Sequence, residues 1–221
     1  MSRLERQISH DVPQNPLPET GNPSLCPSLP GSKGAGYLHF VVTMSRRIKT
    51  LSDYMQLDED SRVELLEGEF FMTPSPNFRH QMTLMKLGTH LHLFATQNGV
   101  GCVIPAPFDA ILSDHDVVQP DLVYVATENL GRIHERLHGP PDLAVEIQSA
   151  SNAERDRIVK RDLYRKYGVR EYWLVDPNAD TIEVLSLDSG EWRLHGIFRK
   201  GEHLDSPLLP GLRVPLDEVF D

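Results

Sequence analysis

Val118-Gln119-Pro120-Asp121-Leu122-Val123-Tyr124-Val125 places one carboxylate, that of Asp121, among aliphatic, aromatic and β-branched residues. Such residues are typical of a buried strand, so this stretch is predicted to be one. A second apolar stretch, Pro140-Pro141-Asp142-Leu143-Ala144-Val145-Glu146-Ile147-Gln148-Ser149, carries Glu146 in the same way, with Asp142 read as a turn residue at the strand start. Burying a carboxylate costs free energy unless it is paired, and hard cations such as magnesium take oxygen ligands. Two adjacent strands with one acid each therefore predict a shared metal ion.

The segment that follows, Asn152 to Tyr167, has the pattern of a helix and an unusual local charge. Between Ser151 and Arg170 there are seven Lys or Arg residues against three acids. Asp156, Lys160 and Tyr164 are four residues apart, so a helix would place them on one stripe that could face the sheet edge. The alternative is that Asp156 and Lys160 form an ordinary surface ion pair, which contributes little.

The remaining elements follow from periodicity and turn residues. The predicted elements are a capped helix from Thr50 to Leu57, a hairpin over Val63–Met72 that turns at Gly68, a helix from His80 to Gln97, an interrupted strand over Cys102–Leu112, strands over Glu171–Asp176, Thr181–Leu187 and Trp192–Phe198, and a closing helix over Leu216–Phe220.

The pattern as a whole resembles the Uma-two-type family of the PD-(D/E)XK, or restriction-endonuclease-like, superfamily. The resemblance covers roughly Lys49 to Phe220. The motifs that carry it are Pro120-Asp121, Glu146-Ile147-Gln148-Ser149, Asp156 with Lys160, Tyr164, Gly168-Val169 and Glu171-Tyr172-Trp173-Leu174-Val175-Asp176. It implies a three-layer α/β domain in which helices flank a mixed central sheet and the site lies at one edge of that sheet.

The resemblance also implies phosphodiester hydrolysis in which acids on adjacent strands, here Asp121 and Glu146, hold Mg²⁺ or Mn²⁺. In the commonest form of the motif a catalytic lysine sits two residues after the second acid, but this chain has Gln148 there. Lys160, fourteen residues after Glu146, matches the family's lysine on the following helix. A neutral amide cannot replace an ammonium in stabilising charge, so Gln148 is expected at most to orient water.

Four further contacts are expected on the same basis. Glu64, in the first strand of the predicted hairpin, is predicted as a third metal ligand, with a solvent-facing acid on an edge strand as the alternative. His80 is predicted to contact the phosphate or the acids of the site, unless it faces solvent at the helix start. Arg157 and Tyr164 on the basic helix are the other predicted substrate contacts.

Bulk properties suit one domain with a sizeable core. The chain has 221 residues, and its first 43 include six prolines and four glycines, so residues 1–45 are expected to form a disordered extension before a nuclease-like domain at 46–221. Met44 is an alternative start. The absence of a run of about 18 apolar residues argues against a membrane span. Two cysteines, Cys26 and Cys102, cannot build a disulfide framework, which favours the cytoplasm.

The net charge of −10 argues against nonspecific coating of DNA, because phosphate binding rests on Lys and Arg. The local excess of positive charge at residues 151–170 still permits contact with DNA there. A homodimer is a natural expectation, since cleavage of both strands of a duplex usually needs two sites. No small-molecule cofactor is expected.

Three functions compete at this stage. The first is a Mg²⁺- or Mn²⁺-dependent endonuclease acting on DNA, and the second is a catalytically lapsed nuclease fold that serves as a binding or scaffold protein. The third is a zinc hydrolase that uses His134 and His138, which lie four residues apart in the polar segment Ala126–Gly139 and could share a metal on a helix. Asp121, Glu146 and Lys160 together argue against a lapsed site.

Overall fold

A six-stranded mixed sheet forms the centre of the domain in the computed structural model, which describes residues 47–58, 61–73, 75–149 and 156–221. The predicted extension at residues 1–45 lies outside these residues. The strands run in the order β11-β10-β9-β8-β6-β3, and only the β8–β9 pair is parallel. Their bounds are β3 (Gly101–Pro105), β6 (Leu122–Ala126), β8 (Leu143–Ile147), β9 (Glu171–Asp176), β10 (Thr181–Asp188) and β11 (Glu191–Arg199).

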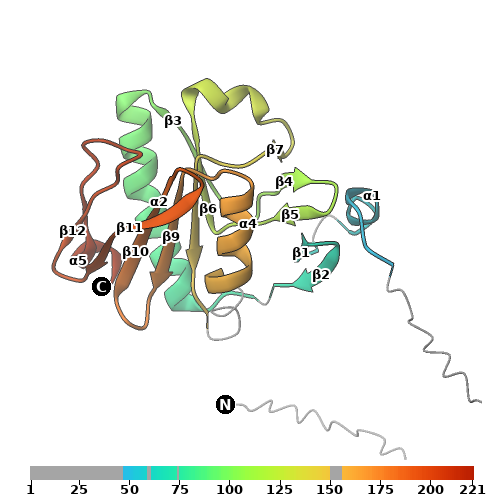
Figure 1. Cartoon of the computed structure of the whole chain (residues 1–221). Coiled ribbons are helices and arrows are strands. Elements are labelled where there is room, and N and C mark those ends of the chain that lie inside the picture. The colour runs from blue at the N-terminus through green and yellow to red at the C-terminus, as the bar shows by residue number, and fades with distance from the viewer. Residues whose placement is uncertain (1–46, 59–60, 74, 150–155) are drawn as a thin grey trace, which may run out of the picture. The chain divides into compact units, whose positions relative to one another are not determined.

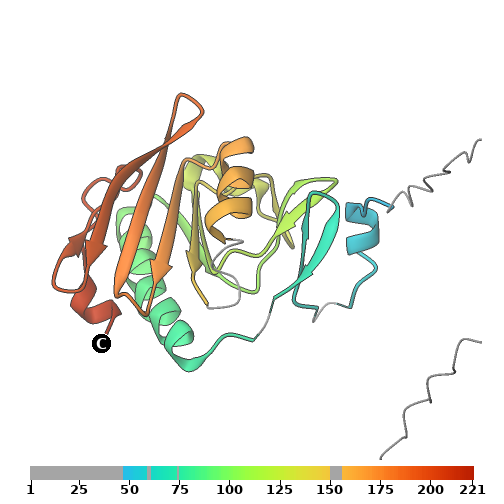
Figure 2. The same cartoon turned by 60° about the horizontal axis from the view of Figure 1, so that its bottom comes forward.

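Helices cover both faces of this sheet (Figures 1 and 2). Every residue of β8 is buried, which explains its nearly continuous apolar sequence. Leu143, Val145 and Ile147 point to the face covered by α2 (Phe78–Asn98), whereas Ala144 packs with the residues of α4 (Arg161–Lys166) on the other face. Side chains alternate along a strand, so Glu146 points toward α4. The three-layer α/β fold expected from the sequence is confirmed.

A second sheet of five short strands lies beside the first, a feature that the sequence did not predict. Its strands run in the order β2-β1-β5-β4-β7. Their bounds are β1 (Val63–Leu66), β2 (Glu69–Met72), β4 (Ala110–Ser113), β5 (Asp116–Val118) and β7 (Leu137–His138). The predicted hairpin is confirmed as β1 and β2, and Glu67 and Gly68 both have positive φ angles in its turn, as a type I′ turn requires. A Cβ at Gly68 would lie 2.2 Å from Ile48 Cγ2, so only glycine fits.

The single strand predicted over Val118–Val125 is wrong. The chain forms β5 and β6, which belong to different sheets, and passes from one sheet to the other through Gln119, Pro120 and Asp121. Proline cannot donate a ladder hydrogen bond, so the strand pattern is interrupted at this position. Asp121 is consequently 20% exposed at the entry to β6 instead of buried within a strand.

Most of the other predicted elements are confirmed. The capping box of Thr50 and Asp53 starts α1 (Leu51–Tyr54). The interrupted strand over Cys102–Leu112 is the pair β3 and β4, and the closing helix is α5 (Leu216–Val219). The last strands of the chain, β12 (His203–Leu204) and β13 (Val214–Pro215), pair with each other.

Two expectations about polar segments differ from the structure. Thr127–Arg132 forms a 3-10 helix (η1) that ends before His134, and His138 lies in β7, so the two histidines do not share a helix. The helix expected over Asn152–Tyr167 is described only from Asp156 onward. There it begins with a π-helical turn at Asp156–Lys160 (η2), which α4 continues. No helix among the described residues is long and apolar enough to cross a membrane.

Asp116 ties the second sheet to α4. Its side chain is buried and accepts hydrogen bonds from the Glu67 N–H (2.7 Å), the Ser113 hydroxyl (3.0 Å) and the Tyr167 hydroxyl (2.6 Å). Burial alone would raise the pKa of Asp116, but the hydrogen bonds from Tyr167, Glu67 and Ser113 hold this pKa below its ordinary value of 3.8. The ionised carboxylate therefore stabilises the junction.

We expect Asp116→Asn to lower the free energy of unfolding by about 1–3 kcal/mol at pH 7, because an amide cannot accept all these hydrogen bonds. A lowered pKa gives stability that is present above the unfolded-state pKa and is lost as pH falls through the folded-state pKa. The difference between wild type and variant should therefore shrink below about pH 4. Urea unfolding at pH 7 and pH 3 measures this, with the exposed Asp162→Asn as control. An equal effect of the two variants at pH 7 would refute this role for Asp116.

Candidate active site

The sheet register brings Asp121 and Glu146 together. Leu122 of β6 pairs with Val145 of β8 in an antiparallel ladder, and the next pair in this register is Asp121 with Glu146. The two acids therefore stand at adjacent positions where β6 begins and β8 ends. This is the arrangement that the sequence predicted, although Asp121 precedes its strand instead of lying within it.

Glu146 accepts two hydrogen bonds from the segment that follows β8. The Lys160 ammonium donates to Oε1 at 2.9 Å and the Tyr164 hydroxyl donates to the same atom at 2.6 Å. Lys160 and Tyr164 are one helical turn apart, so their side chains leave the same side of the backbone. Lys160 is only 4% exposed, which contradicts the alternative of an ordinary surface ion pair with Asp156.

Lys160 also connects Glu146 to the second sheet. Its Nζ lies 2.9 Å from Glu64 Oε1, and the side chain of Glu64 is 1% exposed. Glu64 lies in β1, between β2 and β5, so it is not the solvent-facing acid of an edge strand. The Gln119 N–H donates to the same Oε1 at 2.8 Å. One ammonium thus lies between two buried carboxylates, and each charge has the partner that burial requires.

The side chain of Asp121 is held by contacts from β8 of the central sheet and from helix α2. Its Oδ2 accepts the backbone N–H of Ile147 at 2.7 Å and lies 3.3 Å from His80 Nε2. His80 is buried in the first turn of α2, where its own N–H donates to the N-cap residue Asn77 at 2.9 Å. The start of α2 therefore places an imidazole against the more exposed of the two acids.

The acids face a cavity of about 370 Å³. Asp121, Glu146, Lys160 and His80 all line it, together with Arg62, a second cation that the sequence pattern did not single out. Arg62 comes just before β1 and has no motif around it that could have indicated a role. Carboxylate oxygens and cationic groups thus line the same cavity. Binding a phosphodiester beside a metal ion requires both kinds of group.

The other predicted site residues lie around this cavity. Gln148 is buried, and its backbone N–H donates to the Val175 carbonyl at 2.8 Å. Ile147 and Ser149 line the cavity, whereas Gln148 is not among the described residues that do so. Tyr164 is fully buried against Glu146, and the side chain of Arg157 lies outside the described residues. Roles in catalysis or substrate contact for these three residues stay predictions.

The carboxylate oxygens at the cavity meet some of the requirements of a hard divalent cation. Asp121 and Glu146 offer carboxylate oxygens at the cavity wall, as Mg²⁺ or Mn²⁺ requires. Within the described part of the chain, no group of three or more His, Cys, Asp or Glu side chains is arranged to hold a metal ion. Glu64 contacts Lys160 and is not among the described residues that line the cavity. The pair Asp121 and Glu146 is therefore the better candidate for metal binding, and Glu64 as a third ligand stays a prediction.

Burial and the nearby carboxylates control the ionisation of Tyr164. Its pKa is raised well above 10, first by burial and then by the charges of Glu146 and Glu64. The phenol therefore remains protonated at neutral pH and can donate its hydrogen bond to Glu146. In this way Tyr164 fixes the position of the carboxylate without contacting the solvent.

A mixed sheet covered by helices on both faces, with two acids at adjacent strand ends and a lysine on the following helix, defines a restriction-endonuclease-like protein. A crystal structure of "a putative nuclease belonging to DUF820" from Anabaena variabilis ATCC 29413 has this fold, with a TM-score of 0.66, 20% identity, and coverage of 77% of this chain and 97% of that one. The Uma2 family, described as "Putative restriction endonuclease", matches residues 51–217. The chain belongs to the Uma2 family, and thus to a nuclease family.

Two further comparisons add little. The type IIG restriction endonuclease BpuSI matches with a TM-score of 0.34 and 14% identity over 54% of this chain and 13% of that one, which is too weak to support an argument. A search of curated proteins found no match.

We expect Lys160→Met to lower the free energy of unfolding by about 3–5 kcal/mol, because it leaves Glu64 and Glu146 buried without their shared cation. Adding Glu64→Gln to this variant should recover part of the loss. Chemical denaturation at pH 7 gives both values, with Lys86→Met as a control, whose ammonium donates to the backbone oxygen of Asp221 at the surface. Equal losses in Lys160→Met and Lys86→Met would contradict the buried ion-pair arrangement.

A second prediction concerns alkaline pH. A raised tyrosine pKa contributes stability that is fully present below the unfolded-state pKa and is lost as pH rises toward the folded-state value. Wild-type stability should therefore fall above about pH 10, and Tyr164→Phe should reduce this slope while costing about 1 kcal/mol at pH 7. Unfolding measured between pH 8 and pH 11 tests this, and an unchanged slope would show that Tyr164 is not protected from ionisation.

Proposed function

We propose that this chain is an endonuclease that hydrolyses the phosphodiester bonds of DNA with the help of Mg²⁺ or Mn²⁺. The observation that carries the proposal is the cavity where Asp121, Glu146 and Lys160 meet. Family membership supports nuclease chemistry, and the oxygen donors at the cavity wall support the choice of metal. DNA as the substrate and a homodimer that cuts both strands are part of the same proposal.

Asp121 and Glu146 would hold the ion. When bound, such an ion polarises the phosphate and lowers the pKa of a water molecule. The protein's own part is to keep the two carboxylates at fixed positions. His80 and the Ile147 N–H hold Asp121, and the Tyr164 hydroxyl holds Glu146. This arrangement reduces the reorganisation needed when a charged substrate enters.

Lys160 would supply the positive charge that stabilises the phosphate as negative charge builds up. Its contact with Glu64 keeps the ammonium at the cavity even when Glu146 binds another partner. Glu64 thus acts as a positioning residue for Lys160. Arg62 at the cavity wall can pair with a neighbouring phosphate oxygen, as guanidinium groups commonly do. Gln148 then need not carry charge, which accounts for a neutral side chain at the usual lysine position.

One observation favours a second candidate, a nuclease fold that binds nucleic acid without cutting it. The Lys160 ammonium already contacts both Glu64 and Glu146, so each of these acids has a cationic partner without a metal ion. In that case nucleic acid would bind to the full chain equally well with and without divalent cations.

The deciding experiment is an assay of the full chain on supercoiled plasmid and on short single- and double-stranded DNA and RNA, with Mg²⁺, Mn²⁺ or EDTA. We expect cleavage of DNA with either cation, none with EDTA, and none by Asp121→Asn. Lys160→Met should cut at least about 100-fold more slowly, the scale for losing one charge-stabilising donor.

Glu128→Gln is the matched control, because Glu128 is an exposed acid outside the cavity and should leave cleavage unchanged. Each variant is first checked for its fold by circular dichroism. If a folded wild-type chain cuts no substrate under any condition but binds nucleic acid, the noncatalytic function replaces the nuclease.

A further inference from the structure

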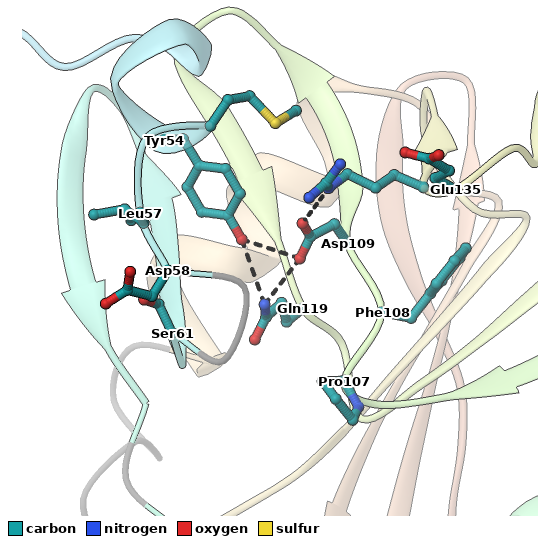
Figure 3. Close-up of a pocket in the computed structure, with 11 residues that line it drawn as sticks. Tyr54, Leu57, Asp58, Ser61, Pro107, Phe108, Asp109, Gln119 and Glu135 are labelled. Carbon is teal, nitrogen blue, oxygen red and sulfur yellow. Dashed lines mark hydrogen bonds and ion pairs between the residues drawn. The ribbon is translucent and has the colours of Figure 1, made fainter.

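A second cavity, of about 530 Å³, is drawn in Figure 3 and shares lining residues with the candidate active-site cavity. Its walls come from α1 and the segment after it, the β3–β4 connection, and the chain just before β7. This volume is in the range of pockets that bind small organic groups, about 300–1,000 Å³. No residue of the predicted catalytic set lines it.

A rigid polar network forms the floor of this cavity. Asp109 accepts hydrogen bonds from the Tyr54 hydroxyl (3.0 Å), the Gln119 side-chain amide (2.8 Å) and Arg136 Nε (2.8 Å), as Figure 3 shows. Burial, then the charge of Asp109, raises the pKa of Tyr54 well above its ordinary value, so its hydroxyl remains a donor. Side chains that hold one another in this way form a site with little freedom to collapse.

The two cavities share part of their walls. Pro107 and Gln119 line both of them. Gln119 is two residues from Asp121, so their Cα atoms are at most about 7 Å apart. A strand whose phosphate lies beside Asp121 would therefore have a neighbouring nucleotide within reach of the second cavity.

The lining selects the kind of group that can enter. Asp58 and Glu135 add two exposed carboxylates, while the only cation among the described lining residues, Arg136, is paired with Asp109. This excess of negative charge disfavours a phosphate and favours a neutral group that donates hydrogen bonds. Tyr54 and Phe108 add aromatic surface. A nucleobase with an exocyclic amino group has both properties, because carboxylates accept from such amino groups and aromatic rings stack on bases.

We propose that this second cavity binds an unpaired nucleobase of the substrate strand, adjacent to the phosphodiester held in the active-site cavity. The inference rests on the proposed nuclease function and extends it. Because a base within a duplex cannot enter such a cavity, the substrate is single-stranded or has a base turned out of its stack. Adenine, cytosine and guanine fit the carboxylate-rich lining better than thymine or uracil.

The test uses single-stranded oligonucleotides that carry an abasic nucleotide at each position in turn around the cleaved bond. With wild type, an abasic nucleotide at one particular position should reduce kcat/KM by about tenfold, the scale of losing one base–aromatic stack. In Phe108→Ala and in Glu135→Gln the same abasic substitution should matter much less. Glu135 is exposed, so its variant is expected to fold normally, and Glu128→Gln is the exposed-acid control that should retain the wild-type ratio.

The ratio between the intact and the abasic substrate isolates base recognition, since a general loss of stability would slow both substrates alike. Equal cleavage of all abasic substrates by wild type, or an unchanged ratio in both cavity variants, overturns the inference while leaving the nuclease in place. If nothing is cleaved, the proposed function fails, and binding of the same oligonucleotides measured by fluorescence anisotropy decides the inference alone. A binding preference for the intact strand that Phe108→Ala abolishes then supports the base site, and equal binding of both strands overturns it.

Discussion

The position of the Lys160 ammonium between Glu64 and Glu146 is the constraint on which the rest of the site depends. The two carboxylates both lie 2.9 Å from the Lys160 ammonium, so they are close enough to repel each other. Burying either carboxylate without a partner would also cost free energy. The lysine removes both costs, but only if three separate parts of the chain meet: β1 of the second sheet, β8 of the central sheet and the turn that precedes α4. The ion pair therefore links the two sheets as well as the site.

The surrounding polar contacts support this arrangement. Gln119, in the connection between the two sheets, donates its N–H to Glu64 of β1 and its side-chain amide to Asp109, which precedes β4. Asp116 joins the hairpin turn to Tyr167 at the end of α4, which keeps the helix close to the second sheet. The apolar core on each face of the central sheet holds α2 and α4 in their layers, and α2 in turn presents His80 to Asp121. Apolar packing thus sets which way α2 and α4 face, and hydrogen bonds set the distances between the polar groups of the site.

The sequence predicted the central sheet well because its strands carry their own local patterns. The apolar stretch of β8 and the meander of β9, β10 and β11 could be identified from periodicity and turn residues alone. Beyond its β1–β2 hairpin, the second sheet could not be predicted, since its strands are two to four residues long and β1 pairs with β5 across a large separation in sequence, Leu65 with Val117. For the same reason Val118–Val125 was mistaken for one strand. Pro120 marks a break in the strand, but nothing local shows that the chain passes to another sheet there.

In the candidate site, too, some contacts are indicated by sequence patterns, whereas others depend on where distant parts of the chain meet. The spacing of Lys160 and Tyr164 follows from helical geometry, and the neighbouring positions of Asp121 and Glu146 were predicted from two consecutive apolar stretches that each carry one of these acids. The contact of Lys160 with Glu64 and the presence of Arg62 in the cavity depend on where the second sheet lies, and no pattern around either residue indicates it.

This dependence also explains how a chain with Gln148 can retain a cation at the site. A lysine on the strand would be placed by the strand itself, whereas Lys160 must be placed by tertiary contacts. Glu64 and Glu146 supply those contacts from opposite sides. The ammonium is consequently tied to the stability of the sheet junction, and a substitution in the second sheet that loosens β1 would act on the candidate active-site cavity without touching it. The geometry of this cavity and the folding of the second sheet are in this sense one property of the domain.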